Sequence, residues 1–257
     1  MPLNLPLRDW NNQRVWVIGA STGIGAATAQ ILLQRGAQVA FSARNETALA
    51  ELAQNHERAL VLPFDATRAG AIEEALRKIT AQWGGVDLVL FVIGTHKPMR
   101  AWELDARAAH ELIEINLLSI MDGCAAVIPQ LLKQGSGGIG IVASVGGYRG
   151  LPVALIYGPS KAALINFVEC LYLDLAPKGI NIYLINPGFV KTPLSDKNEF
   201  KMPALVSAEE AAREIITGME AGKFEIHFPK RFTRVMKLLR ILPYRLYFYL
   251  VRKSTGL

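Results

Sequence analysis

Cysteine and histidine are scarce in this sequence of 257 residues, which holds two of the first and four of the second. Cys124 and Cys170 lie far apart, in segments with the pattern of helices, and the histidines follow no ligand spacing. The sequence therefore lacks a disulfide framework, a redox pair and a metal-binding motif, and we expect no bound metal. Reduced thiols of an intracellular protein explain the two cysteines.

A targeting segment is also lacking. Residues 1–14 contain two prolines and three asparagines, and no apolar run long enough for a signal peptide. We therefore expect a cytoplasmic protein. Hydrophobic residues make up 51% of the chain and charged ones 19%, which excludes a disordered protein and supplies a large core.

Acidic residues are missing from the last 29 positions. Pro229–Leu257 holds eight basic side chains and no acidic one, while the remaining residues hold 20 basic and 22 acidic side chains. The positive net charge thus belongs to the tail alone, which weakens any argument for nucleic-acid binding by the whole chain. No stacking platform or recognition motif accompanies the charge, so we predict no nucleic-acid partner.

The tail itself has the pattern of an amphipathic helix over residues 230–242, with basic residues at 230, 234 and 237. Pro243 ends it, and residues 244–251 add three tyrosines and Phe248. Arg240, Pro243 and Arg245 interrupt the apolar run, so the tail does not span a membrane. Two interpretations stay open: peripheral contact with an anionic membrane, consistent with a lipophilic substrate, or packing on the protein body or on a partner subunit.

Before the tail, short apolar runs alternate with longer helical patterns. Six runs are almost continuously apolar, as in strands buried on both faces: 14–18, 38–42, 59–64, 87–93, 138–143 and 180–185. Helices are expected at 26–34, 107–132 and 158–176. This alternation predicts an α/β fold, a three-layer doubly wound parallel sheet of Rossmann-like type. We predict one domain over residues 1–228, with 229–257 as a basic amphipathic helical extension of it.

A glycine-rich turn joins the first strand to its helix: Gly19-Ala20-Ser21-Thr22-Gly23-Ile24-Gly25. Glycines allow a tight turn whose backbone N–H groups approach a pyrophosphate, and the helix N-terminus favours negative charge. The position directly after the first strand favours a dinucleotide site over a plain strand-to-helix connection.

The end of the second strand bears on which nicotinamide cofactor fits. An NAD enzyme usually has a carboxylate there, whereas this chain has Ser42-Ala43-Arg44. Arg44 can pair with a 2′-phosphate, so NADP is favoured over NAD, against the alternative of a solvated surface arginine. Asp65, followed by Ala66 after the third strand, suits an adenine contact or the capping of the next helix.

Tyr157 and Lys161 stand four residues apart, on one face of a helix. A nearby ammonium favours the phenolate, so we expect the pKa of Tyr157 to fall toward neutrality and the phenol to act as a general acid. The spacing alone is common. The pair becomes informative in combination with other motifs. Along the chain there follow, in order, the glycine turn, Asn116, Ser144, this pair and Asn186-Pro187-Gly188.

Together these motifs resemble the short-chain dehydrogenase/reductase family over about residues 12–225. The resemblance implies that Gly19, Gly23 and Gly25 bind the cofactor with their turn, and that Ser144 polarises a substrate carbonyl. It implies that Tyr157 donates the proton, that Lys161 lowers its pKa and holds the nicotinamide ribose, and that Asn116 supports a linking water. Taken alone, Ser144 could equally be a turn residue and Asn116 a polar group that bends its helix.

The resemblance implies further contacts and an assembly. Contacts to the nicotinamide carboxamide would come from Pro187, Gly188, Val190 and Thr192. The two long helices would form the interface of a homodimer or homotetramer. One departure stands out: where the family usually has Asn-Asn-Ala-Gly, this chain has Phe91-Val92-Ile93-Gly94. Gly94 is kept, but two carboxamides that tie the sheet together are gone.

The resulting hypothesis is an NADP-dependent oxidoreductase that interconverts a ketone and a secondary alcohol, mainly by carbonyl reduction of a small or lipophilic substrate. Its substrate pocket would be lined by residues 96–102, 146–153 and 193–206, which carry few charges. The alternative is a non-catalytic nucleotide-binding protein, a membrane-docked sensor or scaffold, favoured by the altered Phe91-Val92-Ile93 segment and by the tail.

Overall fold

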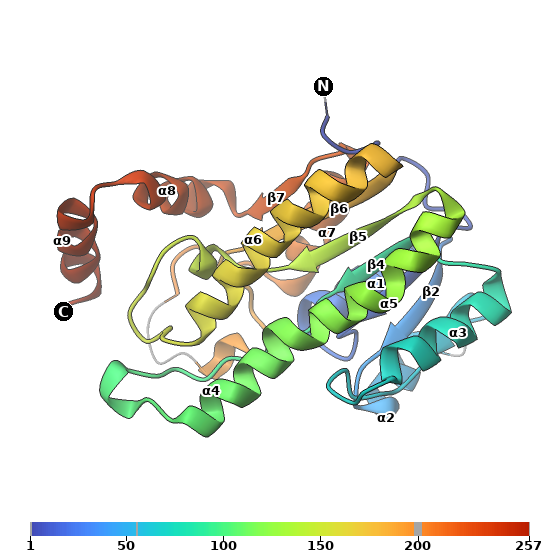
Figure 1. Cartoon of the computed structure of the whole chain (residues 1–257), viewed down its shortest axis with the longest axis horizontal. Helices are drawn as coiled ribbons and strands as arrows, with labels where there is room; N and C mark the ends of the chain where they lie inside the picture. Colours follow the sequence, from blue (N-terminus) through green and yellow to red (C-terminus); the bar gives the residue numbers. More distant parts are fainter. Residues whose placement is uncertain (1, 55, 198–201, 257) are drawn as a thin grey trace.

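The computed structural model describes residues 2–54, 56–197 and 202–256. Seven parallel strands form one sheet in the order β3-β2-β1-β4-β5-β6-β7 (Figure 1). The order reverses between β1 and β4, the switch point at which ligands bind in doubly wound sheets. The strands are β1 Arg14–Ile18, β2 Gln38–Ser42, β3 Ala59–Val61, β4 Leu88–Phe91, β5 Gly137–Val142, β6 Ile180–Pro187 and β7 Glu225–Phe228.

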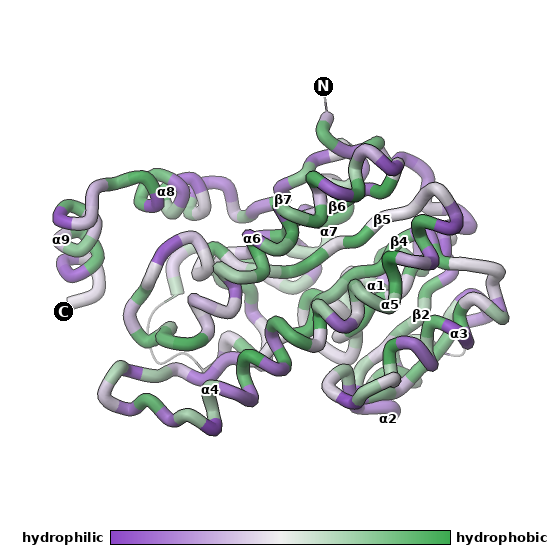
Figure 2. Tube along the Cα trace, in the orientation of Figure 1, coloured by the Kyte–Doolittle hydropathy of each residue, from purple (hydrophilic) through white to green (hydrophobic). Residues whose placement is uncertain are grey.

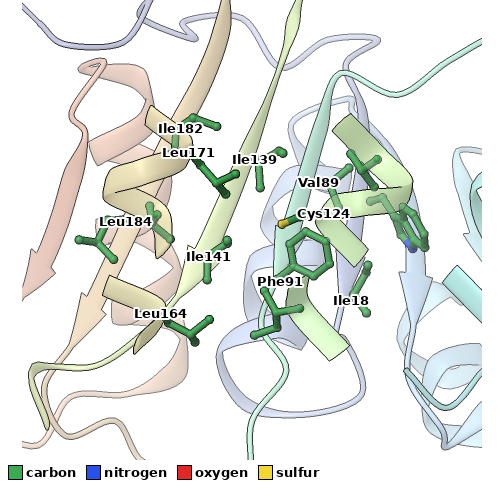
Figure 3. Close-up of a cluster of buried hydrophobic side chains, with 14 of the residues drawn as sticks. Ile18, Val89, Phe91, Cys124, Ile139, Ile141, Leu164, Leu171, Ile182 and Leu184 are labelled. Carbon is green, nitrogen blue, oxygen red and sulfur yellow. The ribbon is translucent and has the colours of Figure 1, made fainter. Parts of the chain in front are cut away.

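Helices cover both faces of the sheet, which makes three layers (Figure 1). On one face, α3, α5 and α6 bury side chains with the core cluster of Figure 3, which includes Phe91, Cys124 and Leu164. On the other, α1 and α7 pack with a second cluster. The helices are α1 Gly23–Gln34, α2 Glu46–Ala53, α3 Ala71–Trp83, α4 Ala106–Ile113, α5 Ser119–Gln134, α6 Tyr157–Leu175, α7 Ala208–Glu220, α8 Lys230–Ile241 and α9 Tyr244–Thr255. The predicted fold class is confirmed.

The strand ends differ from the sequence prediction in places. β3 ends at Val61 and β4 at Phe91, although their apolar runs continue. Beyond these ends, isolated backbone hydrogen bonds, such as Phe64 N–H to Ala43 C=O at 3.0 Å, replace the regular pairing. The seventh strand was not predicted, because Glu225–Phe228 is short and alternates polar with apolar residues. It adds an edge strand beside β6.

One long helical run, Ala106–Gln134, joins α4 to α5 through a π-helical turn at Glu114–Leu118. Its length and apolar composition would also suit a membrane-crossing helix. A core helix has the same properties, and Ile120, Cys124 and Val127 are buried against the sheet. The π turn places Asn116 at the carboxyl edge of the sheet, since its side chain bonds to the segment that follows β4.

The C-terminal extension consists of α8 and α9, separated at Pro243 as predicted. Both helices lie beyond the carboxyl ends of the strands, next to the loop that follows β5 (Figure 1). Figure 2 shows hydrophilic and hydrophobic residues alternating along both helices. The amphipathic pattern of the sequence thus forms two helices at the edge of the sheet where a ligand is expected.

Candidate active site

The glycine turn lies at the switch point, between β1 and α1. Gly19 has a φ of +97°, and a Cβ there would lie 2.8 Å from the carbonyl group of Val92. A Cβ on Gly25 would lie 2.1 Å from the Gly19 carbonyl oxygen. Side chains at either position would collide with backbone, so only glycine allows the first turn of α1 to approach β1 and β4 this closely.

The same turn fits a pyrophosphate. Thr22, the N-cap of α1, makes no side-chain capping hydrogen bond to any described residue, and the first turn holds no acid. The backbone N–H groups of the first turn of α1 are therefore free to bind an anion. A Cβ on Gly23 would lie 2.7 Å from Cγ2 of Thr192, so Thr192 lies against the glycine turn. Ser21 and Ile24 are partly buried in the turn.

Arg44 and Asp65 follow β2 and β3 at the edge of this cradle, and both are exposed. Asp65 accepts hydrogen bonds from the Thr67 N–H at 3.0 Å and the Thr67 hydroxyl at 2.8 Å. The Thr67 N–H chiefly, and Arg44 to a smaller degree, hold the pKa of Asp65 below its ordinary value. Arg44 forms no ion pair among the described residues, so its guanidinium is available to a ligand.

The capping alternative for Asp65 is wrong. Helix α3 begins at Ala71, and its N-cap is Gly70. Asp65 instead closes its own turn through Thr67, because the turn begins several residues before the helix. Ala66 packs partly buried against the core cluster below.

Tyr157 and Lys161 come from the first turns of α6. Lys161 is 3% exposed, and its Nζ donates to the Val142 carbonyl oxygen at 2.9 Å. The same Nζ lies 5.9 Å from the centroid of the Tyr157 ring. Burial lowers the pKa of Lys161 to about 8. The pair is therefore together, with an amine that titrates close to neutral pH.

Ser144 follows β5 and meets the same phenol. A side-chain hydrogen bond from Ser144 favours the phenolate form of Tyr157. The Ser144 hydroxyl oxygen also accepts a hydrogen bond from the Gly146 N–H at 3.0 Å. Ser144 is therefore a turn residue and at the same time lies beside Tyr157. Burial nevertheless dominates and raises the pKa of Tyr157. The expectation of a lowered pKa is wrong here, because desolvation of the phenolate outweighs the Ser144 hydrogen bond.

Asn116 is fully buried and clamps the segment after β4. Its Oδ1 accepts from the Thr95 N–H at 2.7 Å, and its Nδ2 donates to the Thr95 carbonyl at 2.9 Å and the Ser160 hydroxyl at 3.2 Å. A Cβ on Gly94 would lie 3.5 Å from Lys161 Nζ and 3.7 Å from Asn116 Oδ1. The end of β4, the π turn and α6 therefore meet at one point.

Two residues in this cluster go beyond the sequence prediction: Thr95 was not named, and His96 was named only as part of the pocket stretch 96–102. Thr95 binds Asn116 through its backbone alone, which no side-chain motif reveals. The His96 ring packs edge-on against Tyr157, with ring centroids 4.8 Å apart. The sequence placed this histidine in a pocket stretch but gave no reason to place it beside Tyr157. His96, two residues after Gly94, reaches Tyr157 only because the segment after β4 folds over α6.

The structure also brings two predicted pocket stretches together, because the Met99 N–H donates to the Val153 carbonyl at 3.0 Å. The third stretch, 193–206, includes residues 198–201, which lie outside the described residues. Near it, Gly188 N–H donates to Phe228 C=O at 2.7 Å, directly after Pro187 at the end of β6. Val190 is buried in the core and forms an isolated bridge with Val206.

The departure at the end of β4 is filled by apolar packing. Phe91 is fully buried in the core cluster (Figure 3), and the Val92 N–H donates to the Ile18 carbonyl at 2.8 Å. The strand end is thus tied to β1 through backbone and to α5 through packing. Even without the two usual carboxamides, the backbone of Gly94 stays close to Lys161, because a Cβ on Gly94 would lie 3.5 Å from Lys161 Nζ.

A doubly wound sheet with a glycine turn at its switch point, and a half-buried tyrosine beside a buried lysine, defines a nucleotide-binding α/β oxidoreductase. The model of the short chain dehydrogenase family matches residues 13–202. An uncharacterized oxidoreductase of Myxococcus xanthus is 32% identical over 231 residues, 88% of this chain and 91% of the relative. The chain belongs to the short-chain dehydrogenase/reductase family and is an NAD(P)-dependent oxidoreductase acting on CH–OH or C=O groups.

Two solved structures share the fold. A short-chain dehydrogenase from Streptomyces avermitilis has a TM-score of 0.81 at 24% identity and covers 96% of this chain and 98% of its own. Ribose-5-phosphate isomerase from Brucella melitensis 16M has a TM-score of 0.80 at 25% identity, with 86% and 92% covered. Since one fold hosts different reactions, these similarities establish the fold, and the reaction follows from the family and the side chains.

Proposed function

We propose that this chain is an NADP-dependent carbonyl reductase that converts a small or lipophilic ketone into a secondary alcohol. The observation that carries the proposal is the convergence of Ser144 and Lys161 on the Tyr157 phenol. Two elements supply these side chains, the end of β5 and the first turns of α6, and Asn116 fixes the neighbouring segment. A protein that only binds nucleotide has no use for a buried amine beside a half-buried phenol.

When bound, the nicotinamide supplies the hydride to the carbonyl carbon. Ser144 donates a hydrogen bond to the carbonyl oxygen and orients it toward Tyr157. Because burial raises the pKa of Tyr157, the phenol stays protonated at neutral pH and is ready to donate its proton to the same oxygen. Lys161 lies close enough to stabilise the phenolate that remains, and it holds the cofactor ribose. Asn116 supports the water path by which the phenolate regains a proton.

The preference for NADP rests on Arg44. Its exposed guanidinium, which forms no ion pair with the residues that the structure describes, follows β2, where a 2′-phosphate is expected. The sequence has no carboxylate there to bind a ribose hydroxyl. The contacts proposed for the rest of the cofactor are the turn Gly19–Gly25 at the pyrophosphate, Asp65-Ala66 at the adenine, and Pro187, Gly188 and Thr192 at the carboxamide.

The proposed setting is the cytoplasm, with the chain as a homodimer or homotetramer and its tail at a membrane surface. Members of this family act on small molecules and are commonly oligomeric. Exposed apolar side chains on the two long helices support an interface there: Leu132 on α5 and Leu173 on α6. Sedimentation velocity of Leu173→Glu tests this, because the charge would shift the assembly to a smaller species.

The proposed function is tested by isothermal titration of the full chain with NADPH and NADH, repeated on Arg44→Ala. We expect NADPH to bind at least about tenfold more tightly, and we expect the variant to lose this preference. Ketone reduction is then followed by NADPH absorbance with small and lipophilic substrates. Binding without turnover of any ketone or alcohol would favour the non-catalytic alternative. Equal affinities of the unsubstituted chain for NADPH and NADH would mean that Arg44 does not select NADP.

A further inference from the structure

The two C-terminal helices are held on the protein by one face each. On α8, Thr233 and Met236 are buried, and on α9 Tyr247 and Val251 are buried. Arg149, from the loop after β5, caps the end of α8 by donating to the carbonyls of Leu239 at 3.0 Å and Leu242 at 2.5 Å. These contacts fix which face of each helix points outward.

Arg149 also fixes α9. Its guanidinium carbon lies 4.7 Å from the Tyr244 ring centroid and 4.1 Å from that of Tyr247. The Tyr247 hydroxyl donates to the Gly150 carbonyl oxygen. On α8, Lys237 pairs with Glu225 of β7. The extension is therefore docked on the catalytic body through its inner face, and its outer face needs a separate explanation.

The outer face of α8 is apolar and basic at once. Val235, Leu238 and Ile241 are 53%, 59% and 77% exposed, and their spacing of three residues places them along one side of the helix. Arg231 and Arg234 are exposed on the same side, four residues before Val235 and Leu238 respectively. Exposure of three large apolar side chains along one side of a helix is unfavourable in water, and such a patch marks an interaction site.

The outer face of α9 continues this chemistry. Phe248 and Tyr249 are 52% and 60% exposed, and the Tyr244 and Phe248 rings stack with centroids 5.8 Å apart. Arg245 and Arg252 are exposed beside them. Aromatic rings with basic side chains are the composition of segments that lie in the headgroup region of a bilayer.

We propose that the outer face of α8 and α9 docks on the surface of an anionic lipid bilayer, which deepens the membrane contact included in the proposed function. The charge decides the occupant. The 29 residues of the tail hold eight basic side chains and no acid, and a second copy offers little to complement them, because the rest of the chain is nearly balanced at 20 basic and 22 acidic residues. An anionic bilayer supplies the missing negative charge and a place for the apolar rings.

Docking in this orientation has a consequence for the active site. The inner contacts of the tail, through Arg149 and Gly150, are made by the loop that starts at Ser144. Both helices lie beyond the carboxyl ends of the strands (Figure 1), and Figure 2 shows their apolar residues alternating with polar ones. A docked chain therefore holds the Ser144 loop next to the lipid, within reach of a lipophilic ketone.

The test is co-sedimentation of the full-length protein with vesicles, without nucleotide or substrate. One set is phosphatidylcholine alone, and the other contains about 30% phosphatidylserine. We expect binding to the anionic set only, lost at about 0.5 M salt. The double variant Leu238→Glu/Ile241→Glu should bind at least about tenfold more weakly, and Arg234→Glu/Arg245→Glu likewise. Leu5→Glu is the matched control, since Leu5 is 70% exposed on the N-terminal segment, and it should bind like the unsubstituted chain.

Three outcomes would overturn the proposal: no binding to anionic vesicles, equal binding to both vesicle sets, or unchanged binding of both double variants. Sedimentation velocity of the same variants tests the other occupant. A smaller assembly for Leu238→Glu/Ile241→Glu, with vesicle binding unchanged, would make this face an interface between copies. Reduction of a water-soluble ketone separates the two proposals, because it should persist in the variants that lose docking and fails everywhere if the proposed function is wrong.

Discussion

The ring of Phe91 on β4 lies directly against the backbone of Gly123 on α5, where a Cβ would stand 2.4 Å from Phe91 Cε1 and 2.8 Å from Cζ. The family usually has an asparagine at this place in the strand. A phenyl ring needs more room on the helix side of the sheet, and α5 supplies it by having no side chain at 123. The departure in the sequence therefore comes with its own accommodation in the core.

Gly123→Ala should destabilise the fold. The added methyl must push a fully buried ring out of place, which costs about 1–3 kcal/mol as overpacking and outweighs the helix-favouring effect of alanine. Urea unfolding followed by circular dichroism measures the difference. In a Phe91→Ala background the same substitution should cost much less, because the ring is gone. Equal costs in both backgrounds would mean that the two residues do not compete for space.

Tyr157→Phe should lower kcat for ketone reduction by about 10²–10⁴-fold, the usual contribution of a general acid, while NADPH affinity stays within about threefold. The pKa of Tyr157 is raised by burial, so the phenol keeps its proton through neutral pH. The kcat for reduction should therefore be flat around neutrality and fall only in the alkaline range, and alcohol oxidation should rise there. Stopped assays across pH check this, with Tyr249→Phe on α9 as the exposed control.

Tyr157 and Lys161 show which features of the site the sequence predicts and which it does not. The spacing of Tyr157 and Lys161 predicts that both lie on one helix face, and they do, since helical periodicity is a local property. The pKa of the phenol was predicted in the wrong direction, because it depends on burial by distant segments. Thr95 was missed as a site residue, and the contact of His96 with Tyr157 was not predicted, for the same reason: the partners Asn116 and Tyr157 are far away in the chain.

The strands show the same division. β1 and β2 match the prediction residue for residue, because their apolar runs end at turn residues. The strand that starts at Ala59 was predicted too long. Its regular pairing with β2 ends at Val61, and an apolar pattern does not show where pairing ends. β7 was missed because an edge strand with one polar face carries a weak signal.

Lys161→Met should raise stability at neutral pH while abolishing activity. The amine is buried, and its pKa falls from 10.5 to about 8. Below pH 8 the fold therefore keeps a buried charge that the unfolded chain would solvate, at a cost of up to about 3 kcal/mol. Between pH 8 and 10.5 the unfolded chain binds more protons, so stability contributed by this group rises with pH.

The expected gain for Lys161→Met at pH 7 is about 1–3 kcal/mol in the free energy of unfolding, reduced by the lost hydrogen bond to Val142. The gain should shrink as the pH approaches 10.5, the ordinary value for lysine. Denaturant unfolding at several pH values measures it. Lys178→Met, at an exposed position after α6, should show no such pH dependence. A loss of stability at pH 7 would contradict the inferred cost of the buried amine.

Arg149→Met should loosen the C-terminal extension while leaving the sheet intact. The guanidinium is the shared anchor of both helices, since it caps α8 at Leu239 and Leu242 and lies over the rings of Tyr244 and Tyr247. Methionine keeps the apolar stem and removes every donor, so the last carbonyls of α8 lose their partner. Because the tail is rich in lysine and arginine, limited trypsin digestion should cut within residues 230–257 several-fold faster, with mass spectrometry locating the cuts. Arg107→Met, exposed on α4, is the matched control and should digest at the original rate. If the tail of Arg149→Met were cut no faster, the extension would be held by its apolar inner face alone, and Arg149 would serve the loop after Ser144 instead.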